Sequence, residues 1–181
     1  MLMAILKIAR MGHPVLRRVA EPVQDPSDET IRRLAEDMIE TMHDAPGIGL
    51  AAPQVHRSLR IIVFRDAERR EDVDQAESSV VVDPEIAPLD DEIAIALEGC
   101  LSIPGLRGLV PRHVRIGLRG RRLDGRRVDR ELAGLAARIV QHEVDHLDGI
   151  LFTERMDDIR ALVFESELRH LVAGQEGEAT R

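Results

Sequence analysis

The HEVDH string at residues 142–146 constrains the fold more than any other feature of this 181-residue sequence. It lies in the segment 135–147, whose composition and following Asp-Gly pair predict a helix. Because four residues advance a helix by about 6 Å and turn it by roughly 400°, His142 and His146 project from one face and can bind one metal ion. Glu143 is close enough to move protons on a water at that ion. The alternative is a pair of surface histidines on an acidic helix.

A catalytic metal site usually needs a third protein ligand. The only histidine after His146 is His170, and it lacks the spacing of the third ligand in zinc peptidases. Cys100 is the only cysteine, and a thiolate is a strong ligand for zinc or iron. Cys100 is therefore a candidate ligand, although a lone cysteine is often a small buried apolar residue.

The rest of the sequence predicts an α+β fold with mostly antiparallel strands around the metal-binding helix. Apolar spacing predicts an N-terminal helix over residues 31–42 and a C-terminal helix over 158–172. The β-like runs lie between the first two helices, at residues 60–64, 79–82, 92–97, 114–118 and 127–132. This grouping favours antiparallel sheets. We expect a single catalytic domain over residues 1–172 and a frayed tail over 173–181.

Composition and charge argue against several classes of protein. The net charge of −8 disfavours general binding to DNA or to an anionic membrane, because both require many Lys and Arg residues. The sequence contains neither a long apolar run nor a secretory signal pattern, so we expect a cytoplasmic protein. A single cysteine excludes an intrachain disulfide. We also expect a monomer.

The segment GIGLAAPQ at residues 47–54 combines small residues with a terminal amide side chain. Small residues let a substrate backbone come close, and the amide N–H of Gln54 can donate to a developing oxyanion. A simple turn between two elements is the alternative for this segment.

Three strings resemble the signature motifs of the peptide deformylase family: GIGLAAPQV at 47–55, EGCLSIP at 98–104 and QHEVDHLDG at 141–149. Their order and separations also match that family. The resemblance covers about residues 5 to 172. It implies a bacterial-type hydrolase that removes the formyl group from the N-terminal formylmethionine of nascent proteins and releases formate.

The resemblance also implies roles for individual residues. One metal ion would be held by three side chains: Cys100, His142 and His146. Glu143 would act as general base and then as general acid, while Gln54 and the backbone N–H of Leu101 would stabilise the formyl oxygen. In this family Fe(II) is the usual native metal, and Zn, Ni or Co can occupy the site in purified protein.

The family pattern further assigns substrate contacts. Backbone groups of Ile48, Gly49 and Gly99 would bind the peptide like an added strand. The methionine slot would be bounded by three side chains: Arg107, Leu135 and Ile139. Plain core packing is the alternative for Leu135 and Ile139.

The sequence departs from the family pattern at two positions, and it suggests one supporting contact. His56 stands where many members have glycine, and Arg138 stands where the residue is often apolar; we expect neither to touch the catalytic set. Glu98 is expected to accept a hydrogen bond from an arginine such as Arg112. A solvated surface pair is the alternative for these two side chains.

Other functions stay open at this point. One alternative is a zinc peptidase of another lineage, which shares the HExxH chemistry. A second is a catalytically silent relative that only binds peptide N-termini. A third is a cysteine hydrolase that uses Cys100 as nucleophile. The family resemblance also raises docking on the ribosome through a basic C-terminal helix. Residues 157–181 contain three arginines against six acidic residues, which does not suit RNA.

Overall fold

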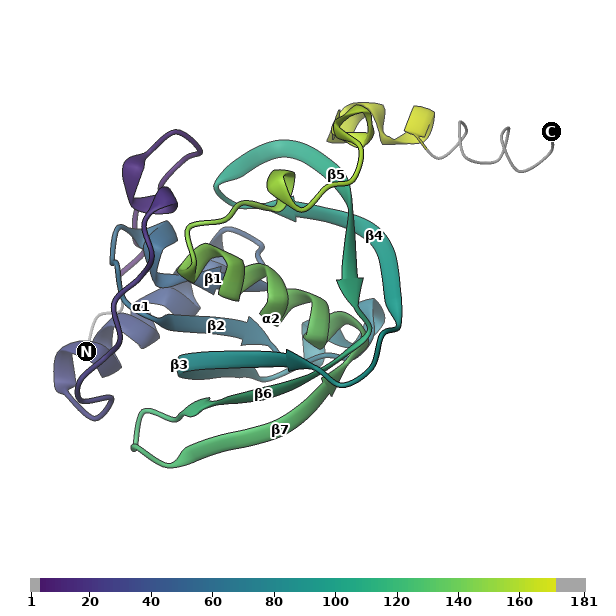
Figure 1. Ribbon diagram of the computed structural model, residues 1–181. Helices are drawn as coiled ribbons and strands as arrows, with labels where there is room; N and C mark the ends of the chain where they lie inside the picture. Colours follow the sequence, from purple (N-terminus) through teal and green to yellow (C-terminus); the bar gives the residue numbers. More distant parts are fainter. Residues whose placement is uncertain (1–3, 172–181) are drawn as a thin grey trace.

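The computed structural model, which describes residues 4–171, places two antiparallel sheets around a central helix, α2 (Gly134–Leu147). Figure 1 shows α2 lying across the larger sheet, with β4 and β5 on its other side. This arrangement confirms the predicted α+β fold. None of the helices in the described part of the chain is long and apolar enough to cross a membrane.

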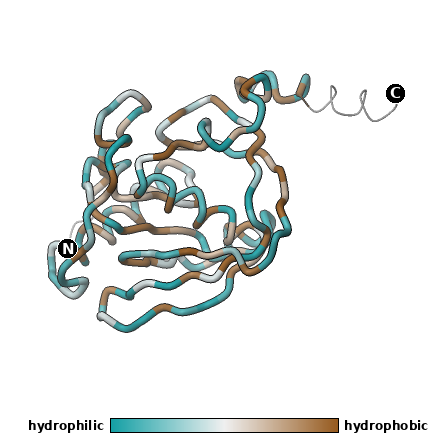
Figure 2. The backbone as a smooth tube through the Cα atoms, viewed as in Figure 1, coloured by the Kyte–Doolittle hydropathy of each residue, from teal (hydrophilic) through white to brown (hydrophobic). Residues whose placement is uncertain are grey.

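The larger sheet has five strands in the order β1-β2-β3-β6-β7, and every neighbouring pair is antiparallel. The strands are β1 (Gly49–Ala51), β2 (Ile61–Arg65), β3 (Ser78–Pro88), β6 (Arg115–Arg121) and β7 (Arg127–Ala133). The apolar run of β2 lies inside the molecule (Figure 2), and its residues from Ile61 to Phe64 are fully buried. The face of this sheet toward α2 holds the main apolar core.

The smaller sheet has the order β4-β5-β8, with β4 (Ile93–Cys100) at one edge. β5 (Ile103–His113) pairs along the whole of β4, whereas β8 (Val163–Phe164) pairs only with Leu106 and Arg107. A turn at residues 101–102 joins β4 to β5. This hairpin carries Cys100 to the helix that bears the histidines.

The first two helices form near the predicted positions. α1 (Glu29–Asp44) starts where the Asp28 side chain accepts a hydrogen bond from the Thr30 N–H at 2.8 Å, which satisfies one free donor of the first turn. α1 packs on β1 and β2 through buried methionines. α2 is followed by Gly149 at φ +75°, a conformation that favours glycine.

The predicted C-terminal helix is present but begins later than expected. Helical conformation starts at residue 168 and continues to 171, the last described residue. The preceding residues form two short 3-10 helices, Ile159–Ala161 and Glu165–Glu167, with β8 between them. Pairing of β8 with β5 outweighs the helical apolar pattern here, so the predicted start at 158 is wrong. The predicted tail, 173–181, lies outside the described residues.

Candidate active site

Three potential metal ligands meet where the two sheets face α2. Cys100 comes from the end of β4, and His142 and His146 come from successive turns of α2. The Cys100 Sγ lies 3.2 Å from the His146 Nε2, and one ligand atom from each of the three residues lies within 4.8 Å of the others. No other such group of three occurs among residues 4–171.

The donor set fits a divalent transition metal. A thiolate with two imidazoles suits zinc or iron(II), and three protein ligands leave a coordination position for water. Burial disfavours ionisation of Cys100, but His146 and His142 hold the pKa of its thiol well below the usual range. The thiol is therefore prepared to act as a thiolate ligand.

Glu98 fixes the orientation of His142. Its carboxylate lies 2.8 Å from the His142 Nδ1, which leaves the other ring nitrogen for the metal. Arg112 donates two hydrogen bonds to Glu98, at 3.0 and 3.1 Å, so the predicted contact between these residues is confirmed. Burial alone would raise the pKa of Glu98, but the hydrogen bonds from His142 and Arg112 lower it to about 2. Glu98 is thus a charged, buried support for a metal ligand.

The ionic cluster behind the histidines is larger than the sequence indicated. Arg138 donates to Glu98 at 2.8 Å and to the carbonyl oxygens of Val110 and Ala94. Arg138 therefore touches the partner of His142, although we expected it to lie apart from the catalytic set. Arg112 also donates to Asp145 at 2.5 Å.

Asp145 and Arg155 complete this cluster. Arg155 donates to Asp145 at 2.7 Å, which gives the buried carboxylate a second cationic partner. Sequence reasoning missed both residues. Asp145 lies inside the HEVDH string, and an acidic residue on the metal-binding face of a helix was the available signal. Nothing in the sequence indicated its partners.

Glu143 lies in a tight, buried position beside β1. Burial raises the pKa of its carboxyl to about 7, although His142 and His146 act in the opposite direction. A Cβ added to Gly49 would collide with the Glu143 carboxylate and would lie 2.7 Å from the Ile139 side chain. The close approach of strand and helix therefore requires glycine at position 49.

Gln54 reaches the same site from the 3-10 helix Ala52–Val55. Its Oε1 accepts a hydrogen bond from the Ala51 N–H at 2.8 Å, which fixes the orientation of the amide. The Nε2 then donates to the Ser102 Oγ at 3.2 Å and lies 3.5 Å from the Cys100 Sγ. Leu101 follows Cys100 in the turn after β4. Both predicted oxyanion donors therefore lie next to Cys100.

The predicted substrate residues fall into two groups. Ile48, Leu135 and Ile139 belong to or pack against the core beneath α2. Arg107 lies over Gly99 on the smaller sheet, where a Cβ at position 99 would collide with its guanidinium, and Arg107 pairs with Glu165 at 2.9 Å.

A surface cavity of about 520 Å³ lies elsewhere, beside residues 66–76, which include the 3-10 helix Arg70–Gln75. Most of its lining residues are charged or polar, and none of them is a predicted substrate residue. This cavity is therefore not the apolar methionine slot that the sequence predicts.

Comparison with known proteins agrees with this geometry. Residues 5–161 match the family model described as polypeptide deformylase. Peptide deformylase 1 of Bordetella pertussis is 45% identical over 161 residues, which cover 88% of this chain and 90% of that protein. Peptide deformylase 1 of Prochlorococcus marinus is 41% identical over 169 residues, which cover 92% of this chain and 88% of that protein.

Solved structures give the same result. The crystal structure of a class I type b peptide deformylase from Acinetobacter baumannii with Met-Ala-Ser bound has a TM-score of 0.79 and 38% identity, and it covers 86% of this chain and 100% of that one. A plant peptide deformylase structure has a TM-score of 0.79 and 33% identity, and it covers 98% of this chain and 93% of that one. This chain therefore belongs to the polypeptide deformylase family, whose members are hydrolases that remove the N-formyl group from nascent proteins.

Proposed function

We propose that this chain hydrolyses the formyl group of N-terminal formylmethionine at a metal centre formed by Cys100, His142 and His146. The observation that carries this proposal is the convergence of these three ligands with the buried Glu143 carboxylate. We infer Fe(II) as the physiological metal, because a thiolate with two imidazoles suits a divalent iron as well as zinc. A divalent ion held there supplies Lewis-acid activation of water and of the formyl carbonyl.

Glu143 acts on protons in this proposal. Its carboxylate accepts a proton from the attacking water and then donates it to the departing amine nitrogen, so that formate and a free N-terminus result. Burial raises the pKa of this carboxyl above its usual value, which strengthens it as a proton acceptor. The absence of a side chain at Gly49 leaves room for this carboxylate beside β1.

Gln54 and Leu101 stabilise the oxygen that gains negative charge. The Gln54 amide is oriented by the Ala51 N–H, so its Nε2 donors face the Cys100 region before substrate arrives. A preorganised donor of this kind needs no rearrangement when the oxyanion develops. The backbone N–H of Leu101 supplies the second donor.

The peptide lies between β1 and β4 in this proposal. Ile48 is held beside β2, because its carbonyl accepts the Arg65 N–H at 2.8 Å, and we propose that its backbone contacts the peptide. Gly49 and Gly99 offer backbone groups on the two sides, and the methionine side chain enters a slot bounded by Leu135 and Ile139. Arg107, which lies over Gly99 on the outer face, borders the peptide beyond the methionine. The relative from Acinetobacter baumannii with Met-Ala-Ser bound supports a substrate of this kind.

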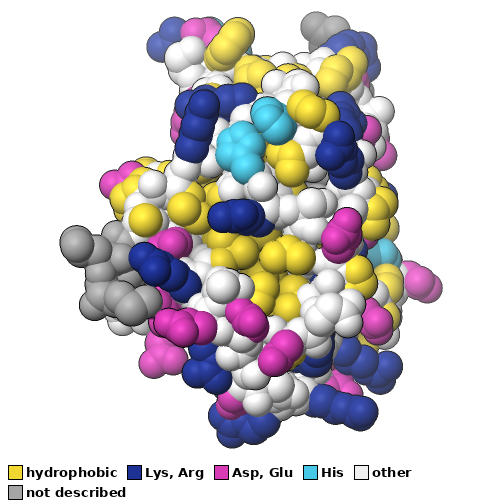
Figure 3. All heavy atoms as spheres, turned by 90° about the vertical axis from the view of Figure 1, so that its left-hand side faces the viewer, with side chains coloured by type: hydrophobic (Ala, Val, Ile, Leu, Met, Phe, Trp, Pro, Cys, Tyr) yellow, Lys and Arg dark blue, Asp and Glu magenta, His cyan; other side chains and the backbone are white. Residues whose placement is uncertain are grey.

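Nascent formylmethionyl peptides are the partners that this proposal requires. The face seen in Figure 3 carries basic and acidic side chains side by side around apolar groups, and no continuous basic surface is seen among its described residues. This mixed charge does not suit extended binding to nucleic acid. We propose a monomer that acts on free peptide ends, and the charges given above offer no support for ribosome docking.

Formate release from formyl-Met-Ala-Ser tests the proposed function. Protein purified without oxygen and loaded with Fe(II) or Ni(II) should release formate, should stop when a chelator removes the metal, and should recover when the metal is restored. A metal-loaded protein that releases no formate would contradict the proposal at the level of substrate. Activity that persists after complete metal removal would contradict the metal mechanism.

A further inference from the structure

The edge strand β4 exposes an apolar stripe made of Ile93, Ile95 and Leu97. These side chains are 55%, 62% and 41% exposed, and all three lie on the outer face of the smaller sheet. The alternate residues of β4, including the buried Glu98, face α2. Edge strands normally carry charges or other features that prevent pairing, so three large exposed apolar residues on one edge require a reason.

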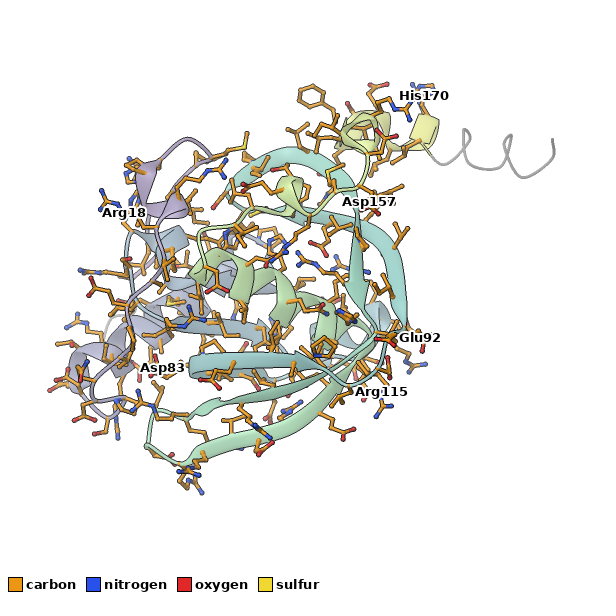
Figure 4. The ribbon with its side chains drawn as sticks, in the orientation of Figure 1. Arg18, Asp83, Glu92, Arg115, Asp157 and His170 are labelled. Carbon is orange, nitrogen blue, oxygen red and sulfur yellow. The ribbon has the colours of Figure 1, made fainter. Side chains whose placement is uncertain are left out.

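The backbone of β4 is also free to pair along this edge. The Val114 N–H donates to the Glu92 carbonyl at 2.9 Å, just before β4 begins (Figure 4 labels Glu92). Glu92 and Val114 therefore form a hydrogen-bonded pair. Because hydrogen-bonded and non-hydrogen-bonded pairs alternate along an antiparallel ladder, the even-numbered residues of β4 also point their peptide groups toward β5. The odd-numbered residues from Ile93 to Gly99 therefore point theirs toward the open edge. Within residues 4–171, no strand pairs there.

The direction of β4 suits a peptide whose N-terminus lies at the metal site. β4 runs toward Cys100, so a peptide that pairs antiparallel with it runs from Gly99 back toward Ile93. The methionine side chain points inward to its slot, and the second residue therefore lies on the outer face opposite Gly99. By the two-residue period of a strand, residue four lies beside Leu97 and residue six beside Ile95.

We propose that the open edge of β4 binds the nascent peptide beyond its third residue and favours apolar side chains at positions four and six. This inference rests on the proposed function, because the deformylase reaction fixes the peptide N-terminus beside Cys100. The Met-Ala-Ser held by the Acinetobacter baumannii relative has three residues, so a longer peptide is needed to reach the stripe. Continuity between the site and this edge favours the substrate over a second copy of the chain.

Two heptapeptides of equal composition test the proposal in the wild-type protein. Formyl-Met-Ala-Ser-Leu-Ser-Leu-Ser places leucine at positions four and six, whereas formyl-Met-Ala-Ser-Ser-Leu-Ser-Leu places it at five and seven. We expect kcat/KM to be about tenfold higher for the first peptide, as partial burial of apolar side chains predicts. The double variant Ile95→Thr/Leu97→Thr should remove this difference. The control variant Ile159→Thr, which changes an equally exposed residue outside β4, should retain it.

Equal kcat/KM for the two heptapeptides would overturn the proposal. If the protein releases no formate from any peptide, calorimetric affinities of the same peptides without the formyl group decide the question. A preference there for leucine at positions four and six supports the edge as a peptide site, and equal affinities overturn it. A wild-type dimer that becomes monomeric in the double variant would assign the stripe to a second copy and would also overturn the proposal.

Discussion

The two sides of α2 are held in different ways. Toward the larger sheet, α2 presents apolar side chains such as Val140 and Leu147, which pack against β2, β3, β6 and β7. Toward the smaller sheet, it presents His142, Gln141 and Asp145, which are held by hydrogen bonds and ion pairs. The same helix therefore joins an apolar core to a buried polar cluster.

This difference separates stability from geometry. Apolar burial contributes about 25 cal/mol per Å² and tolerates small shifts, because it has no direction. Buried ion pairs gain little net stability, since desolvation offsets their attraction, but they fix distances and angles. We infer that the larger sheet mainly stabilises α2 and that the smaller sheet mainly orients the ligands.

The largest expected effect is on the rate of formate release, through Glu143 on α2. Glu143→Gln keeps the size of the side chain but removes the proton acceptor, so formate release should fall by about 100- to 10,000-fold. Metal content should stay at the wild-type level, because Glu143 is not a ligand in this account. Steady-state assays with metal analysis of the same samples would check both statements. A variant that loses its metal would show that Glu143 supports the site instead.

The next effect compares the two sides directly. Arg112→Met leaves Glu98 and Asp145 with fewer partners, and it should lower the free energy of unfolding by about 3 to 5 kcal/mol. Leu118→Ala in the larger sheet should cost about 2 to 5 kcal/mol through a cavity. Chemical denaturation should therefore show similar losses in the free energy of unfolding for the two variants. Chelator competition, in contrast, should show weaker metal binding only in Arg112→Met. Equal loss of metal affinity in both would erase the distinction between the sides.

A third effect concerns Gln54, in the 3-10 helix that follows β1. Gln54→Leu has a similar volume but cannot donate to the oxyanion, so kcat should fall by about 100- to 1,000-fold. KM and metal affinity should change little, because the contact forms mainly in the transition state. Michaelis–Menten analysis with formyl-Met-Ala-Ser would separate these quantities. A large rise in KM with unchanged kcat would assign Gln54 to ground-state binding.

The smallest effect concerns two residues in the left-handed region, His56 at φ +63° and Asp83 at φ +49°. His56→Gly should raise the free energy of unfolding by about 0.5 to 1 kcal/mol, because glycine adopts this conformation without strain. Asp83→Gly should lower it, because Asp83 accepts the Val23 N–H at 3.0 Å and pairs with Arg121. Thermal unfolding of both variants would show whether this contrast in sign holds.

Sequence patterns predicted the apolar elements around α2 better than the polar cluster on its other side. The spacing of residues 31–42 and the runs of β2 and β7 each describe a local apolar surface, and such surfaces repeat with the period of their element. β5 was missed, because Pro104 and Pro111 argue against a strand. Pro111 is tolerated, since it pairs with Ile95 at a position where its nitrogen faces away from β4.

The residues of the candidate site that belong to sequence motifs were predicted, whereas their partners from other segments were not. The spacing of His142 and His146 predicted that they share one helix face, and the family resemblance implied Cys100. The partners of Glu98 and Asp145 come from segments far apart in the chain, and local periodicity has no information on such contacts. Arg138 shows this limit clearly, because its position on α2 was known but its reach to β4 and β5 was not.

Cobalt substitution tests the central claim that Cys100, from the smaller sheet, completes a site begun by two histidines on α2. The metal-free protein would be loaded with Co(II), and its absorption compared with that of Cys100→Ser. If Cys100 is a ligand, the wild type should show a thiolate-to-cobalt charge-transfer band in the near ultraviolet, and the variant should lose this band and bind cobalt more weakly. An identical spectrum and affinity in both proteins would show that Cys100 is not a ligand.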